Sequence, residues 1–120
     1  MSGNILVADD NTASRELIRE VLEMSGYDVV EAADGQDAVD RARERAPDLV
    51  LVDIQMPRLD GYGVLRELRA DPRLSALHVV ALTAFAMQGD RERALEAGFD
   101  GYITKPVDIA ALRREVRRFL

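Results

Sequence analysis

The chain has 120 residues, no cysteine and a formal net charge of −6, because 22 acidic residues outnumber 16 basic ones. This length suits one domain, which we expect over residues 1–120. The lack of cysteine excludes a disulfide framework, a thiolate metal site and a cysteine nucleophile. The negative charge disfavours nucleic acid or an anionic membrane as a direct partner. Since no apolar stretch is long enough for a membrane span or a signal-peptide core, we expect a cytoplasmic protein.

Short apolar runs alternate with amphipathic segments from one end of the chain to the other. The runs are rich in valine, isoleucine and leucine, as strands buried on both faces are, and they lie at residues 5–8, 27–30, 49–52, 79–82 and 101–103. Apolar residues at helical spacing follow each run, namely Leu17, Ile18, Val21 and Leu22, then Ala38, Val39 and Ala42, then Val64, Leu65 and Leu68, then Ala94 and Leu95, and last Ile109, Leu112, Val116 and Phe119. Helix ends are predicted at Gly26, Pro47, Pro72 and Gly98.

Strict alternation of five strand–helix units predicts an α/β fold with a parallel sheet covered by helices on both faces. Right-handed crossovers and the chain length favour a doubly wound, five-stranded parallel sheet of the flavodoxin-like (βα)5 type, with strand order 2-1-3-4-5. A closed barrel needs more units, and a helical bundle would lack the short β-branched runs.

Polar residues with specific chemistry follow four of the predicted strands. Asp9 and Asp10 follow the first strand, Asp53 the third, Thr83 the fourth, and Lys105 comes just after the fifth. The carboxyl ends of parallel strands form one edge of such a sheet, so we expect these groups to meet there. Lys105 is the only lysine among the 16 basic residues. A compact ammonium suits a small anion such as a phosphoryl group better than a planar guanidinium does.

Three neighbouring carboxylates repel one another, so at least one of them should hold a proton or bind a cation. Mg²⁺ suits such a site because it takes one or two carboxylates, keeps several waters and leaves room for a phosphate oxygen. Aspartate is also a competent nucleophile for phosphoryl groups and gives an acyl phosphate. The residue set therefore predicts a phosphoryl-transfer site with Mg²⁺ as its cofactor.

Four segments carry a resemblance to a known family: residues 6–11 (LVADDN), 52–61 (VDIQMPRLDG), 82–84 (LTA) and 105–106 (KP). In this order and at this spacing they resemble the receiver domain of bacterial two-component response regulators, and the resemblance covers nearly the whole chain. It implies a signalling switch of a phosphorelay rather than a metabolic enzyme. Such a domain catalyses only its own Mg²⁺-dependent phosphorylation and its own dephosphorylation.

The resemblance also implies a role for each acidic residue of the site. Asp53 would accept a phosphoryl group from a phosphohistidine on a sensor histidine kinase or a histidine phosphotransfer protein. Asp10 and Asp53 would bind Mg²⁺ together with the backbone carbonyl of Gln55. Asp9 would hold the metal through a coordinated water.

The phosphoryl oxygens have their own implied partners in this family. The Lys105 ammonium and the Thr83 hydroxyl would bind them, helped by backbone N–H groups near Met56 and Ala84. The peptide bond between Lys105 and Pro106 would be cis, an isomer that proline makes accessible.

A conformational switch is implied by the same resemblance. On phosphorylation Thr83 would move toward the phosphoryl group, and Tyr102 would turn inward into the vacated space. The surface of the fourth helix, fifth strand and fifth helix would then change its affinity for a downstream protein effector, or support a phosphorylation-dependent dimer. Residues 83–91 resemble a narrower group of stand-alone cell-cycle regulators and receivers joined to histidine kinases or diguanylate cyclases. In the family, the positions of Gln55 and Phe85 tune how fast the phosphate hydrolyses.

Other interpretations of these residues remain open from sequence alone. Asp9 and Asp10 could merely cap the following helix. An aspartyl-phosphate phosphatase also uses an aspartate and Mg²⁺, but it usually has a second acid two residues after the nucleophile, where this chain has Gln55. A degenerate receiver that binds partners without phosphate is a third reading. His78, the single histidine, is expected to be structural because it has no partner for ligation or proton relay.

The predicted last helix is strongly basic. Its arginines are Arg113, Arg114, Arg117 and Arg118. A solvated helix face and a docking surface for an acidic partner are both compatible with this pattern.

Overall fold

The structure is a computed structural model and describes residues 3–84 and 87–120. Within these residues five strands alternate with five helices, as the sequence predicts. The strands are β1 (Asn4–Ala8), β2 (Asp28–Ala32), β3 (Leu49–Asp53), β4 (His78–Thr83) and β5 (Gly101–Thr104). The helices are α1 (Thr12–Met24), α2 (Gly35–Arg45), α3 (Gly61–Ala70), α4 (Asp90–Ala97) and α5 (Ile109–Phe119). None of the helices in the described part of the chain is long and apolar enough to cross a membrane.

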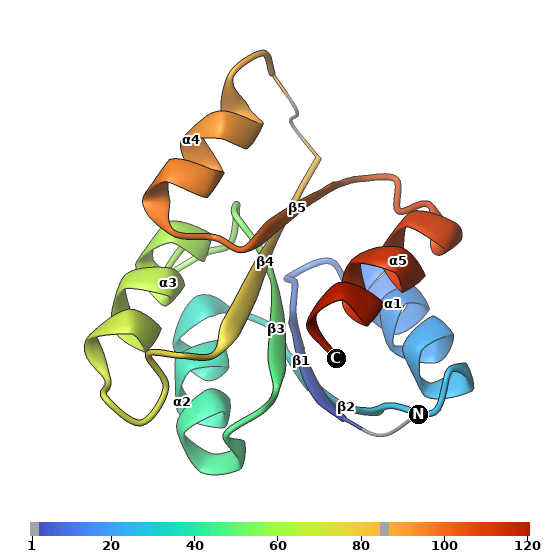
Figure 1. Cartoon of the computed structure of the whole chain (residues 1–120), viewed down its shortest axis with the longest axis horizontal. Helices are drawn as coiled ribbons and strands as arrows, with labels where there is room; N and C mark the ends of the chain where they lie inside the picture. Colours follow the sequence, from blue (N-terminus) through green and yellow to red (C-terminus); the bar gives the residue numbers. More distant parts are fainter. Residues whose placement is uncertain (1–2, 85–86) are drawn as a thin grey trace.

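The strands form one parallel sheet in the order β2-β1-β3-β4-β5, which confirms the predicted doubly wound, flavodoxin-like fold. Helices α1 and α5 cover one face of the sheet, and α2, α3 and α4 cover the other (Figure 1). Successive residues of β1 point to opposite faces. Ile5 and Val7 belong to the apolar core beneath α1 and α5, whereas Leu6 and Ala8 belong to the core beneath the other three helices. Burial on both faces explains why the strands are continuously apolar.

The helices begin at the edge of the sheet where the strands end, and most of them begin with a side-chain cap. The capping residues are Asn11 for α1, Asp34 for α2, Asp60 for α3 and Asp108 for α5. Each accepts a hydrogen bond from a backbone N–H of the first helical turn, which has no partner within the helix. These caps set where each helix starts and therefore where each connection leaves the edge.

The second strand begins and ends later than the apolar pattern predicts. The pattern indicates residues 27–30, but β2 spans Asp28–Ala32. Tyr27 instead completes the end of α1, since its N–H donates to the Leu22 carbonyl at 3.1 Å and its side chain is buried. Glu31, a polar residue that seemed to end the run, stays in the strand because an arginine of α1 pairs with its carboxylate.

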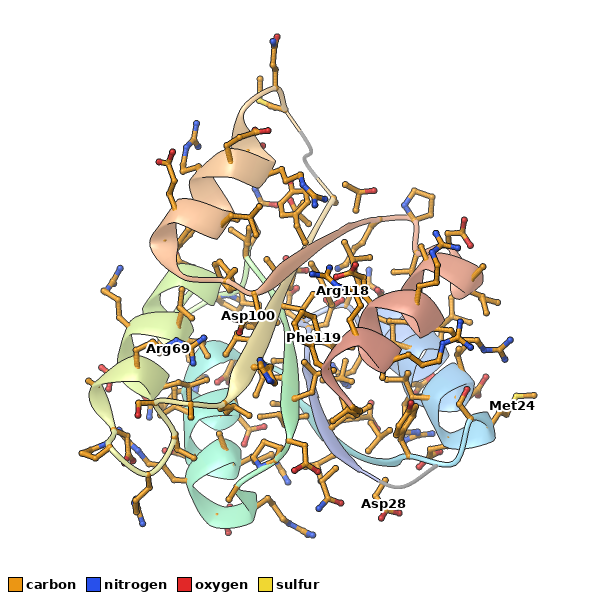
Figure 2. The ribbon with its side chains drawn as sticks, viewed as in Figure 1. Met24, Asp28, Arg69, Asp100, Arg118 and Phe119 are labelled. Atoms are coloured by element: carbon orange, nitrogen blue, oxygen red, sulfur yellow. The ribbon has the colours of Figure 1, made fainter. Side chains whose placement is uncertain are left out.

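An arginine of α3 forms hydrogen bonds with the loops that lead into β4 and β5, at the end of the sheet where the strands begin. The Arg69 guanidinium donates to the backbone carbonyls of Leu77 and Gly98 and to the Asp100 carboxylate. The same carboxylate accepts the N–H of Val79 at 2.8 Å, next to the start of β4. Figure 2 shows Arg69 and Asp100 approaching each other across this edge. This network supports the sheet at the edge away from the candidate site.

Glycine is required where α2 approaches the connection between β3 and α3. A Cβ atom on Gly35 would lie 1.8 Å from the backbone oxygen of Leu59 and 2.7 Å from the Leu59 Cβ. We therefore expect Gly35→Ala to lower the free energy of unfolding by about 2–3 kcal/mol, because the backbone must move to relieve the overlap. Urea denaturation measures this change. The neighbouring exposed residue supplies a control, since Gln36→Ala should change stability by no more than about 0.5 kcal/mol. An unchanged unfolding midpoint for Gly35→Ala would contradict the steric argument.

Candidate functional site

The sequence-predicted polar residues meet at the carboxyl edge of the sheet. Within residues 3–84 and 87–120, the only buried polar or charged residues are Asp9, Asp53 and Thr83. They stand at or just beyond the ends of β1, β3 and β4, which are neighbouring strands. Burial of a polar group costs free energy unless the group is paired. Three such residues in one place therefore indicate a functional site rather than a role in core packing.

Lys105 joins two of these groups. Its ammonium lies 2.6 Å from Asp53 Oδ2 and 2.6 Å from Asp9 Oδ2. The backbone N–H of Lys105 donates to the Thr83 carbonyl at 2.7 Å, which holds the residue beside the end of β4. The bond between Lys105 and Pro106 is cis, as the family resemblance implies. The one lysine of the chain therefore bridges two carboxylates that come from different strands.

Three carboxylates lie close to one another at this site. Asp9, Asp10 and Asp53 each offer an oxygen, and these oxygens lie within 4.8 Å of one another. Asp9 and Asp53 are buried, whereas Asp10 is exposed. One ammonium against three carboxylates leaves a net negative charge at the site. Oxygen ligands with an excess of negative charge fit a hard divalent cation such as Mg²⁺.

Backbone N–H groups fix the two buried carboxylates. Gln55 N–H donates to Asp53 Oδ1 at 2.8 Å, and Asn11 N–H donates to Asp9 Oδ1 at 2.9 Å. The cap of α1 is Asn11, whose side chain accepts from Ser14 N–H. The hypothesis that Asp9 and Asp10 merely cap the helix is therefore wrong.

The protonation of Asp53 and Lys105 reflects burial opposed by their ion pair. Burial raises the pKa of Asp53, and the charge of Asp9 adds to this rise, while the Lys105 ammonium and the Gln55 N–H oppose it. Burial by itself would lower the pKa of Lys105, but its hydrogen bonds to Asp53 and Asp9 outweigh this effect and raise the pKa. Lys105 is thus held as an ammonium next to a carboxylate that is poorly solvated.

Tyr102 of β5 lies beside Thr83, on the face of the sheet that α2, α3 and α4 cover. Its hydroxyl is buried and its ring packs against the core beneath α2, α3 and α4. Burial raises the pKa of Tyr102, as does the charge of Asp90, while the nearby Thr83 hydroxyl opposes the rise. A small cavity of about 100 Å³ lies among Thr83, Tyr102, Tyr62 and the start of α4. The two residues predicted to act as a switch are therefore neighbours.

The remaining predicted site residues lie in the loops at the same edge. Gln55, two residues after Asp53, is exposed, and Met56, three residues after it, is buried. Ala84 is exposed and follows Thr83. Phe85 lies outside the described residues. His78 is at the other end of β4, where its ring stacks on Phe119 with the centroids 4.9 Å apart. This position agrees with its expected structural role.

Several supporting residues were missed in the sequence. The Arg15 guanidinium donates to the Asp9 backbone carbonyl at 2.7 Å and pairs with Glu31 of β2. A Cβ on Gly61 would lie 2.8 Å from the Asp53 backbone oxygen, so only glycine permits the turn after β3 to close this tightly. Nothing local in the sequence marks this contact between Gly61 and Asp53.

Comparisons with known proteins agree with this geometry. Residues 5–117 match the family described as the response regulator receiver domain. The chain is 38% identical over 120 residues to the polar-differentiation response regulator DivK of Brucella ovis, with 100% of this chain and 98% of that protein covered.

Solved structures give the same result. The receiver domain of the sensor histidine kinase PA1611 of Pseudomonas aeruginosa PAO1, described with a magnesium ion coordinated in its active-site cleft, is 39% identical with a TM-score of 0.90, covering 99% of this chain and 98% of that one. The chemotaxis protein CheY4 of Vibrio cholerae shares the fold, with a TM-score of 0.92 at 24% identity and full coverage of both chains. This chain belongs to the response-regulator receiver domain family, the phospho-accepting switches of two-component signalling.

Proposed function

We propose that Asp53 is the phosphoacceptor of this receiver and that the donor is a phosphohistidine on a sensor kinase or phosphotransfer protein. The observation that carries the proposal is the Lys105 ammonium at 2.6 Å from both Asp53 and Asp9, inside a cluster of three carboxylates. A structural ion pair would need one carboxylate. A third carboxylate, exposed on Asp10, provides a ligand for a cation that enters from solvent.

The acidic groups of the site would bind Mg²⁺, some of them directly and one through a water. Asp10 and Asp53 would hold the metal with the backbone carbonyl of Gln55, and Asp9 would hold it through a water. When bound, Mg²⁺ supplies positive charge next to the phosphoryl oxygens. The fit follows from the oxygen-only ligands and from the net negative charge that remains after Lys105 is counted.

The transfer itself needs one nucleophile and one cation from this chain. A carboxylate oxygen of Asp53 attacks phosphorus as the bond between phosphorus and the donor imidazole breaks, and the imidazole leaves as the neutral base after taking up a proton. Lys105 stays within reach of the phosphoryl oxygens because its backbone N–H is bonded to Thr83. The Thr83 hydroxyl and backbone N–H groups near Met56 and Ala84 would bind the other oxygens.

A groove beside Lys105 offers a place for the donor protein. It measures about 530 Å³ and is lined by Ala13, Ser14, Leu17, Ala84, Lys105, Pro106 and Val107. Most of these side chains are apolar, and Leu17 is 44% exposed. An apolar groove next to the reacting carboxylate suits a helix that brings a histidine to Asp53.

Phosphorylation would change the surface formed by α4, β5 and α5. Tyr102, next to Thr83, also lines a groove of about 340 Å³ on this side, together with Arg91, Thr104 and Arg114. A shift of Thr83 toward a phosphoryl group would change the space available to the Tyr102 ring. The groove would change with it, and so would its affinity for a downstream protein effector.

The coupling between Thr83 and Tyr102 can be tested without knowing the effector. Beryllofluoride with Mg²⁺ should shift backbone amide signals in α4, β5 and α5 of the wild type in an NMR titration. In Thr83→Ala we expect beryllofluoride still to bind, while the shifts in α4 and at Tyr102 fall at least about three-fold, because the link between the site and the ring is gone. Tyr62→Phe, which keeps a ring near the same cavity, serves as the control. Equal shifts in Thr83→Ala and wild type would refute the coupling.

The phosphoacceptor proposal itself is tested by intact-mass spectrometry after incubation with acetyl phosphate, with and without Mg²⁺. We expect a gain of one phosphoryl mass only with Mg²⁺. Repeated turnover of small phosphate esters would favour a phosphatase instead, although Gln55 in place of a second acid makes this unexpected. No mass gain, together with no response to beryllofluoride, would favour a binding module that works without phosphate.

A further inference from the structure

Exposed apolar side chains gather on the solvent side of α1 and α5. Five large apolar residues stand out as exposed in the described chain, and three of them are on these two helices: Leu17 at 44%, Met24 at 81% and Ile109 at 44%. Figure 2 shows Met24 projecting away from the body of the molecule at the end of α1. Such residues are costly to leave in water when they cluster, so this face is suited to contact with a protein.

The charged residues of the same face are separated by sign between the two helices. On α1, Leu17, Glu20 and Met24 follow one another at spacings of three and four and share one side of the helix. On α5, Ile109, Arg113 and Arg117 are spaced by four and share one side. The first stripe carries one acidic residue and the second carries two basic residues, and apolar residues accompany both.

Contacts of the neighbouring residues show that the two stripes face the same way. Leu17 lines the groove that also contains Pro106 and Val107, just before α5. Arg113 and Arg117 line a hollow that also contains Ser25 and Tyr27, just after α1. Both stripes therefore flank the seam between α1 and α5, on the face away from α2, α3 and α4.

The charged residues of these stripes form no ion pair with the described residues of the same chain. Among the ion pairs between described residues, none involves Glu20, Arg113 or Arg117, whereas Arg118 pairs with Glu115 on the same helix. A stripe with an acidic residue next to a stripe with basic residues is self-complementary under a two-fold rotation. The acidic stripe of one copy then meets the basic stripe of the other, twice. A contact of α1 with α1, or of α5 with α5, would bring like charges together.

We propose that the face formed by α1 and α5 is a two-fold interface between two copies of this chain, with Glu20 of each copy opposite Arg113 of the other. The helices have 13 and 11 residues, so the face is about 20 Å long. A contact of this size lies at the small end of specific interfaces, and the dimer is therefore weak and sensitive to salt. Leu17 belongs both to this face and to the groove beside Lys105, so the dimer covers part of that groove.

Charge reversal gives a decisive test, because each variant alone brings like charges together at both Glu20–Arg113 contacts of the proposed dimer. Glu20→Arg places an arginine opposite Arg113 of the other copy, and Arg113→Glu places a glutamate opposite Glu20 of the other copy. Sedimentation velocity up to about 1 mM protein, a range that reaches weak interfaces, reports the association. It is run without phosphoryl donor or Mg²⁺, so the result does not depend on the function proposed for Asp53. Glu44→Arg on α2 and Arg66→Glu on α3 are matched controls on the other face; both residues are exposed.

We expect the wild type and both controls to associate with increasing concentration. Each reversed variant alone should bind itself at least about ten-fold more weakly, and an equimolar mixture of the two should regain association, because both contacts of the mixed pair join opposite charges. A wild type that stays monomeric over this range overturns the proposal, as does a mixture that fails to associate. A monomeric wild type whose two variants lose phosphotransfer from a kinase would assign the face to that protein instead.

Discussion

Asp53→Asn is expected to reduce phosphorylation by acetyl phosphate to below about 1% of the wild-type level, because the amide is not a nucleophile for phosphorus. The side chain keeps its size and can still accept the Gln55 N–H that now bonds to Oδ1 at 2.8 Å. Intact-mass spectrometry measures the loss. A phosphorylated Asp53→Asn protein would show that another residue is the acceptor.

The fold of this variant should be intact, which separates lost chemistry from lost structure. Burial raises the pKa of Asp53, so its ionised form is disfavoured in the folded state, and an uncharged amide removes that cost. Lys105 keeps Asp9 as a partner at 2.6 Å. We expect thermal unfolding at or above the wild-type temperature. Asp10→Asn is the companion variant. It should weaken Mg²⁺ binding, so that phosphorylation needs a higher Mg²⁺ concentration, while leaving the acceptor in place.

Lys105→Met is expected to lower the free energy of unfolding by about 3 kcal/mol at pH 7, because it leaves two buried carboxylates without their cation. Asp9 is 0% and Asp53 5% exposed, so both carboxylates are poorly solvated. Urea denaturation measures the change. Mg²⁺ should restore much of the stability if the folded state binds it, since a ligand of the native state stabilises by mass action.

The loss should depend on pH in a direction set by Asp53. In the wild type burial already raises the pKa of this carboxyl, and removing the ammonium raises it further. A group whose folded-state pKa lies above its unfolded value of about 3.9 destabilises the fold as pH rises through the folded value. The deficit of Lys105→Met relative to wild type should therefore be small near pH 4 and full at neutral pH. A deficit that is constant with pH would mean that lost packing, and not charge, is responsible.

Lys105→Arg separates charge from shape at this position. The positive charge is kept, so most of the stability lost in Lys105→Met should return. Phosphorylation should still fall, because a planar guanidinium cannot place one compact charge at 2.6 Å from two carboxylates of different strands. Normal phosphorylation by this variant would contradict the argument that the single lysine is there for its geometry.

Much of the fold could be predicted from the sequence, because the residue patterns that specify strands and helices are local. Strands buried on both faces must be apolar throughout, and amphipathic helices must repeat their apolar residues at helical spacing, so the order of elements and the polar ends of β1, β3 and β4 followed directly. The error at β2 has a physical cause as well. Tyr27 looks like a strand residue by type, but the backbone bond to Leu22 draws it into the end of α1.

The sequence by itself determined which polar residues form the candidate site and the edge of the sheet at which they gather. Only the tertiary structure decided how they are paired, because the partners are far apart in the chain: Lys105 and Asp53 are 52 positions apart and meet only when β5 and β3 lie in one sheet. The same holds for the approach of Gly35 to Leu59. These contacts depend on helix and strand packing across the whole domain, which no local pattern of residues encodes.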